Sequence, residues 1–189
     1  MSSKADIQVL SAAPGVSLGR RAIAIGLGAL VVALAAQVRV PLPFTPVPVT
    51  LQDLAVLTVG GLLGPAAGAA ALVSYLGLGI LGLPVFAGGG AGLPWLFGPT
   101  GGYLLAFPVA AFVMGLLAHR RGLVRTLLGA ALGMTIIHLG GVAQLAVLTG
   151  SVDVAVRTGS LPFLPVSLIK AGLAAALVAG ISPRVTKLL

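Results

Sequence analysis

One lysine stands inside an otherwise apolar stretch near the end of the sequence. Lys170 lies seven residues into the stretch 163–181, which contains no other charged residue. An ammonium group that faced lipid there would cost about 2.5–3.5 kcal/mol, so it normally faces a cavity or a partner. At a depth of about 10 Å, its stem could instead snorkel to the outer headgroups. Ser167 lies one helical turn earlier on the same face and could share a ligand with Lys170.

Other polar side chains also fall at or within apolar stretches. Gln52 and Asp53 stand near the outer end of one such stretch, where helix capping, interhelical hydrogen bonding and ligand contact are all open. His138 and Gln144 lie inside a later stretch, where they are expected to join helices, with ligand contact as the alternative.

Four of the aromatic residues are candidates for two different roles. Tyr75, Phe86, Trp95 and Tyr103 could form the aromatic belt that is common at membrane interfaces. Phe86 and Trp95 belong to a long connection, however, and could fold over a pocket.

The sequence gives little indication of a metal site, a reactive thiol or a nucleotide-binding site. The chain has no cysteine, and His119 and His138 have no second ligand at metal-site spacing. The glycine pattern at 77–82 matches a dinucleotide fingerprint by chance, because no acidic residue is available to bind ribose. A nucleotide-hydrolysing loop is also missing. We therefore expect no cofactor, no metal and no enzymatic activity.

The composition is that of a membrane protein. Of the 189 residues, 58% are hydrophobic and only 7% are charged, and the mean hydropathy is +1.16. Soluble domains carry roughly 25% charged residues. The net charge of +8 does not indicate nucleic-acid binding, because the basic residues lie in the gaps between apolar runs.

Six apolar stretches predict an all-α integral membrane protein with six transmembrane helices. Residues 1–21 are expected to be a flexible or surface segment, 22–182 the transmembrane substrate-binding domain, and 183–189 a short cytoplasmic tail. The connections 39–49, 84–100 and 150–162 are expected to be long loops. The six predicted helices span residues 22–38, 50–63, 66–83, 101–118, 126–149 and 163–181.

If successive connections lie on alternate sides of a membrane, eight basic residues fall on the side of the termini and two on the other side. Because the cytoplasmic side of membrane proteins is enriched in Lys and Arg, the bias predicts cytoplasmic termini, extracytoplasmic long loops and a multi-pass protein of the inner membrane. Arg39 and Arg157 fall outside. The expected cytoplasmic residues are Lys4, Arg20, Arg21, Arg120, Arg121, Arg125, Arg184 and Lys187.

Small residues repeat along one face of the first predicted helix. Ala22, Gly26, Ala29 and Ala33 would allow another helix to approach closely. This stripe could serve packing inside the chain or docking of a second membrane protein.

Four ordered motifs resemble the BioY family, the biotin-specific substrate-capture (S) components of energy-coupling factor transporters. The resemblance covers roughly residues 22–182, in matching order and spacing. The motifs are VPLPFTPVPVTLQ at 40–52, GLPVFAGG at 82–89, GPTGGY at 98–103, and PFLP followed by LIKA at 162–171.

The resemblance implies a biotin site near the outer face, covered by the first loop, and no chemistry on the substrate. It also implies docking through Ala29 and Ala33 onto a transmembrane coupling protein, with a pair of ATP-binding cassette ATPases supplying energy. A homo-oligomer is a further possibility for the same stripe. The expected substrate-binding residues are Lys170, Ser167, Trp95, Tyr103, Phe86, Gln52, Asp53 and Thr45.

One position departs from the family pattern, which usually reads Gly-Asp before Leu-Ile-Lys. This chain has Val166 and Ser167 there. Ser167 could still form a hydrogen bond, and Asp53 or Asp153 could supply the carboxylate. Two other classes are less consistent with the sequence. An intramembrane enzyme would need an acid–base pair or a nucleophile, and a channel or structural subunit would lack a tight, saturable site.

Overall fold

The computed structural model describes residues 18–119 and 122–185, with side chains up to Ile181. The expectations for residues 1–17, for Arg120 and Arg121 and for residues 186–189 lie outside the described residues. This applies to Lys4 and Lys187 and to most of the predicted N-terminal segment. For Arg184, only the helical backbone is described.

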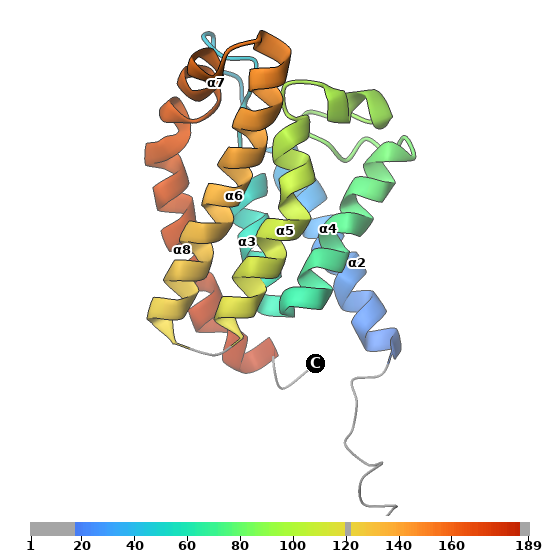
Figure 1. Cartoon of the computed structure of the whole chain (residues 1–189). Coiled ribbons are helices and arrows are strands. Elements are labelled where there is room, and N and C mark those ends of the chain that lie inside the picture. The colour runs from blue at the N-terminus through green and yellow to red at the C-terminus, as the bar shows by residue number, and fades with distance from the viewer. Residues whose placement is uncertain (1–17, 120–121, 186–189) are drawn as a thin grey trace, which may run out of the picture.

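The described chain is mostly helical (Figure 1). Besides the α-helices, the described residues form a two-stranded antiparallel ladder and two short 3₁₀ turns, Leu93–Phe97 and Leu161–Phe163. The elements are α2 (Leu18–Gln37), β1 (Arg39–Val40), β2 (Val49–Thr50), α3 (Gln52–Leu63), α4 (Pro65–Ile80), α5 (Gly101–Ala118), α6 (Leu123–Thr149), α7 (Val152–Gly159) and α8 (Leu164–Val185).

The six predicted helices all form, with different ends. The fourth has the predicted bounds, whereas α2 begins four residues earlier than predicted, at Leu18. α8 continues to Val185, so residues 183–185 of the predicted tail belong to this helix. Arg20 and Arg21 had been assigned to the segment before the helix, but arginine is a good helix former and both lie within α2.

The connection 150–162 is not a plain loop, because it contains α7. Ser151 caps this helix, its side chain accepting a hydrogen bond from the Val154 N–H at 3.3 Å. Asp153 and Arg157 form an exposed ion pair of 2.9 Å along it. A serine cap followed by a short polar helix could have been read from the sequence, and the prediction missed it.

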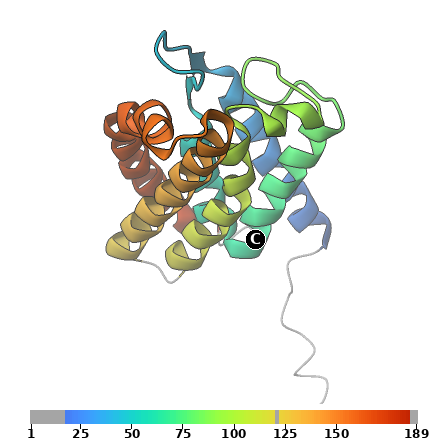
Figure 2. The same ribbon diagram turned by 45° about the horizontal axis from the view of Figure 1, so that its top comes forward.

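The helices α2, α3, α4, α5, α6 and α8 run in alternating directions along the molecule, and the short α3 begins below the loop end (Figure 1). The three long connections meet at one end, where α7 also lies. Tilting the molecule brings this end forward (Figure 2), and a hydrogen bond from Thr45 to Thr158 joins the first loop to α7 there. α5 lies centrally and packs against α3, α4 and α6. This arrangement gathers the long connections over one end of the bundle.

The outer surface of the bundle is apolar, as expected of a surface that faces lipid. Leu34, Leu132 and Leu168 are examples of large apolar side chains that lie exposed on different helices. Within the described residues, four helical segments are long and apolar enough to span a membrane, namely α2, α5, α6 and the segment Val152–Ile181. Two shorter apolar helices, α3 and α4, lie among them. The four longer segments are candidate membrane spans, as the composition predicts.

The small residues Ala29 and Ala33 of α2 are buried inside the chain, 2% and 9% exposed. Both belong to the hydrophobic core, where α2 packs against α3 and α4. Of the two roles considered for the stripe, internal packing fits these two residues. The expectation that they form a docking surface needs correction, since their side chains are covered by the chain's own helices.

Glycines allow the central helices to approach closely. A β-carbon at Gly60 of α3 would lie 2.4 Å from the Ala111 carbonyl oxygen of α5. A β-carbon at Gly68 of α4 would lie 2.8 Å from the Gly60 Cα. The C-terminal half of α3 is therefore held between two neighbouring backbones.

Replacing Gly60 with alanine should destabilise this packing by about 1–3 kcal/mol, because the added methyl overlaps backbone atoms that cannot move independently. The measurement is the midpoint of thermal unfolding in detergent. Gly77→Ala is the matched control, because a β-carbon there meets no atom within 4 Å. Equal midpoints for the two variants would contradict the proposed role of Gly60.

Candidate substrate-binding site

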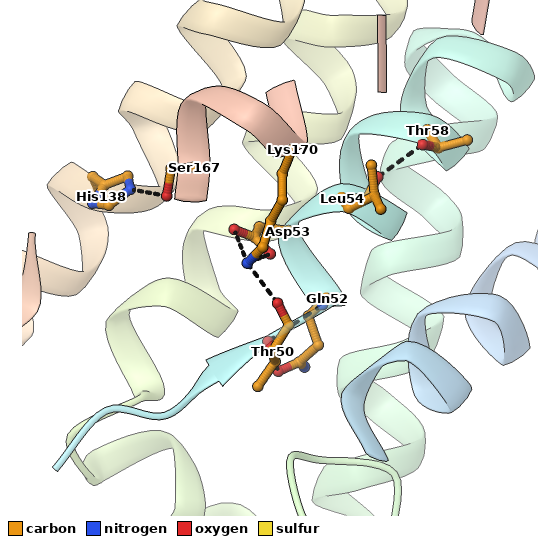
Figure 3. A network of polar contacts seen from close by, with 8 residues as sticks. All are labelled: Thr50, Gln52, Asp53, Leu54, Thr58, His138, Ser167 and Lys170. Carbon is orange, nitrogen blue, oxygen red and sulfur yellow. Dashed lines mark hydrogen bonds and ion pairs between the residues drawn. The ribbon is translucent and has the colours of Figure 1, made fainter. Parts of the chain in front are cut away.

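Lys170 forms a largely buried ion pair with Asp53 (Figure 3). The Lys170 Nζ lies 2.9 Å from Asp53 Oδ1 and 3.1 Å from Oδ2, and it donates to the Thr50 carbonyl oxygen at 2.6 Å. Lys170 is only 8% exposed. The lysine therefore points into the protein, and the snorkelling alternative is wrong for this structure.

Three separate elements position this pair. Lys170 lies on α8, Asp53 in the first turn of α3, and Thr50 in β2, which pairs with β1. A carboxylate in the first turn of a helix also benefits from the positive end of the helix dipole. Because removing one partner of a buried pair leaves an uncompensated charge, Lys170 and Asp53 depend on each other. Of the two acidic residues considered as replacements for the family carboxylate, Asp53 is the one that contacts Lys170.

Gln52 connects α3 to α4 and to the loop that follows α4. Its Nε2 donates to the Tyr75 hydroxyl at 2.7 Å, and that hydroxyl donates to the Val85 carbonyl oxygen at 3.2 Å. The Thr50 hydroxyl donates to Gln52 Oε1 at 3.3 Å. Interhelical hydrogen bonding, one of the alternatives for Gln52, is therefore confirmed, although Gln52 also borders the cavity described below.

His138 bridges α8 and the turn that precedes it. Its Nε2 lies 3.0 Å from Ser167 Oγ, and its Nδ1 lies 3.1 Å from Ser160 Oγ. A neutral imidazole has one donor and one acceptor, so both nitrogens can be satisfied at once. The expectation that His138 joins helices is confirmed. Gln144 instead holds a loop, because its Nε2 donates to the Leu96 and Gly98 carbonyl oxygens at 3.3 and 3.4 Å.

A cavity opens beside the ion pair, beneath the long connections. The space between its walls measures about 610 Å³, a volume that includes open solvent at its mouth. Six of the eight predicted binding residues border it, namely Lys170, Ser167, Trp95, Tyr103, Gln52 and Asp53. The remaining walls are formed by Val47, Pro48, Val49, Thr50, Ala87, Thr100, Leu104, Phe107, Ile137, His138 and Phe163.

Phe86 and Thr45 do not border the cavity, contrary to the prediction. Phe86 is fully buried and packs edge-on against Tyr75, with ring centroids 5.6 Å apart. Its ring occupies the space that the absence of a side chain at Gly79 leaves free. Thr45 donates its hydroxyl to the Thr158 carbonyl oxygen at 2.7 Å and so fastens the first loop to α7.

Several wall residues were missed by the sequence analysis, although a helical spacing relates some of them. Thr100, Leu104 and Phe107 recur at intervals of four and three residues around Tyr103, so they share one face at the start of α5. Identifying this face as the cavity wall would have required knowing which side of α5 faces α3. Tyr103 itself donates its hydroxyl to the Gly159 carbonyl oxygen.

Comparison with known proteins finds one family across almost the whole chain. The model of the BioY family matches residues 5–187. A probable biotin transporter BioY of Pyrococcus horikoshii is 41% identical over 151 residues, covering 79% of this chain and 90% of the relative. A biotin transporter BioY of Thermotoga maritima is 38% identical and covers 82% and 92%.

A solved structure has the same fold. It is the S-component for biotin from an ECF-type ABC transporter, with a TM-score of 0.81, 24% identity, and coverage of 88% of this chain and 92% of the other. The family match and the relatives agree with the motifs noted in the sequence. The chain belongs to the BioY family.

Proposed function

We propose that this protein captures biotin with high affinity at the cavity beside Lys170 and Asp53, for uptake across the cytoplasmic membrane. Membership of the BioY family and the names of the relatives support this substrate. The observation that carries the assignment to this cavity is the buried ion pair of Lys170 and Asp53, which borders a mostly apolar space.

The chemistry of the cavity matches the head of biotin. The ureido ring has two N–H donors and one carbonyl acceptor, and the rest of the bicycle is an apolar thioether. Asp53 can accept from an N–H, and Lys170 can donate to the carbonyl, without either losing its charge partner. Phe107, Ile137 and Phe163 supply apolar walls for the ring system.

The proposed topology has six membrane crossings and cytoplasmic termini. The alternating directions of α2, α3, α4, α5, α6 and α8 support it (Figure 1). α3 has 12 residues and would extend about 18 Å, so the surrounding helices and loops must complete its crossing. Arg20 and Arg125 begin α2 and α6 at the end opposite to Arg39 and Arg157, which agrees with the charge bias.

Energy for concentrative uptake is proposed to come from other polypeptides, because the sequence has no nucleotide-hydrolysing loop. A transmembrane coupling protein and a pair of ATP-binding cassette ATPases are the proposed partners, as in the transporter type named for the solved structure. Ala29 and Ala33 are not proposed as docking residues, since bulky replacements there would disturb the bundle itself.

Lys170→Met should weaken biotin binding by about 1.5–3 kcal/mol, the range for hydrogen bonds to charged groups. The measurement is equilibrium binding of labelled biotin to purified protein in detergent. Arg157→Met is the matched control, because it removes a cation from an ion pair that is exposed on α7. Equal affinities of the folded Lys170→Met variant and the wild type would exclude Lys170 from the site.

The stability of the Lys170→Met variant should be lower by about 3–5 kcal/mol, because Asp53 is left as a buried unpaired charge. Adding Asp53→Leu should recover most of the lost stability, while biotin binding stays weak. Thermal unfolding and biotin binding, measured on the same three proteins, separate the two effects. If the double variant regains full binding, the pair has only a structural role.

The topology predicts opposite labelling of two single cysteines in this cysteine-free chain. Val152→Cys, at the exposed start of α7, should react with an impermeant maleimide in intact cells. Leu123→Cys, at the exposed start of α6, should react only after the membrane is permeabilised. Labelling of both positions from the same side would contradict the proposed arrangement.

A further inference from the structure

A second hollow adjoins the cavity and contains the cation Arg39. It shares the wall residues Pro48, Ala87, Trp95 and Thr100 with the cavity, so the two spaces are neighbours. We call this second hollow the vestibule. The other residues around it are Arg39, Pro46, Ala91, Pro94, Gly98 and Pro99. A ligand held in the cavity could therefore extend into the vestibule.

Arg39 lies close to the inner site along the β ladder. It is the cross-strand partner of Thr50, whose carbonyl oxygen accepts the hydrogen bond from Lys170. Directly opposed residues in an antiparallel ladder have Cα atoms about 4.5–5.5 Å apart and side chains on the same face. The backbone of Arg39 is thus linked to the Lys170 site through one rung of the ladder.

The glycines that follow α4 hold the Arg39 guanidinium in place. A β-carbon at Gly88 would lie 2.4 Å from Arg39 Cζ, so the guanidinium lies directly over the Gly88 backbone. Gly88 has φ +68°, a conformation that glycine adopts readily. The Gly89 N–H donates to Gln37 Oε1 at 3.0 Å, which fixes the same turn to the end of α2.

The charge of Arg39 is not neutralised within the described part of the chain. The two acidic residues in that part, Asp53 and Asp153, are paired with Lys170 and Arg157. Arg39 therefore presents a net positive charge at the vestibule, whereas the inner pair is neutral as a whole.

Trp95 provides a second donor where the two hollows meet. Its Nε1 is buried and has no hydrogen-bond partner in the described structure. The indole lies over Gly90, where a β-carbon would lie 2.6 Å from its Cε2 atom. A buried donor without a partner costs about 1–3 kcal/mol, and an acceptor on a bound ligand would remove that cost.

We propose that Arg39 and the Trp95 indole N–H form a carboxylate subsite at the vestibule, so that the ligand binds with its ring inward and its carboxylate outward. This inference rests on the proposed function. A carboxylate placed at Lys170 would bring a second anion against Asp53 in a buried site, which like-charge repulsion disfavours. At Arg39 the same group meets an unpaired guanidinium, whose geometry suits carboxylates.

The test compares biotin with biotin methyl ester, which keeps the ring and the carbonyl acceptor but lacks the charge. Wild-type protein should bind biotin roughly fivefold more tightly than the ester, since an exposed ion pair is partly screened by solvent. Arg39→Gln should lower biotin affinity to that of the ester and leave ester affinity unchanged. Arg39→Lys should restore part of the preference for biotin over the ester. High salt should reduce this preference in the wild type.

Trp95→Phe should weaken both ligands by a similar factor, because both retain the carbonyl acceptor. Arg157→Gln is the control for loss of an exposed cation and should change neither affinity. Equal wild-type affinities for the two ligands, or an Arg39→Gln variant that loses both equally, would overturn the carboxylate subsite while leaving the proposed function intact. Wild-type protein that binds neither ligand would overturn the proposed function and this inference with it.

Discussion

The ion pair between Lys170 and Asp53 is the constraint on which the arrangement of this end of the bundle depends. A lysine in an apolar helix must have a partner, and here the partner comes from a helix 117 positions earlier in the sequence. The Thr50 carbonyl oxygen completes the shell around the ammonium group. α8, α3 and the hairpin of the first loop must therefore keep their relative positions for the charge to remain satisfied.

Close helix packing makes that fixed geometry possible. α3 is short, yet it is central, because Gly60 lets it contact the α5 backbone and Gly68 lets α4 contact it from another side. Small residues allow such contacts where lipid supplies no hydrophobic force between helices. The polar bonds of Gln52 and Tyr75 then join α3, α4 and the following loop near the same end. The close packing at the glycines and these hydrogen bonds together hold α3 against its neighbours.

The sequence predicted what depends on local composition and missed what depends on contacts between distant segments. The helices were found because each is an apolar run between breakers, and Lys170 was found because a charge in such a run is costly. That Asp53 pairs with Lys170 was open, since nothing local brings α3 to α8. Phe86 was misplaced because a loop aromatic can cover a pocket or fill a core, and only the space at Gly79 decides.

The separation of charges between cavity and vestibule has a consequence for recognition. The inner pair is neutral as a whole and suits a polar, uncharged head, whereas Arg39 at the vestibule suits an anionic tail. Both are tied to one β ladder, because Arg39 and Thr50 are cross-strand partners and Thr50 also binds Lys170. A ligand of the right length would contact both the inner pair and Arg39. Its fit would then depend on the position of the first loop, since Arg39 and Thr50 belong to the two paired strands of that loop.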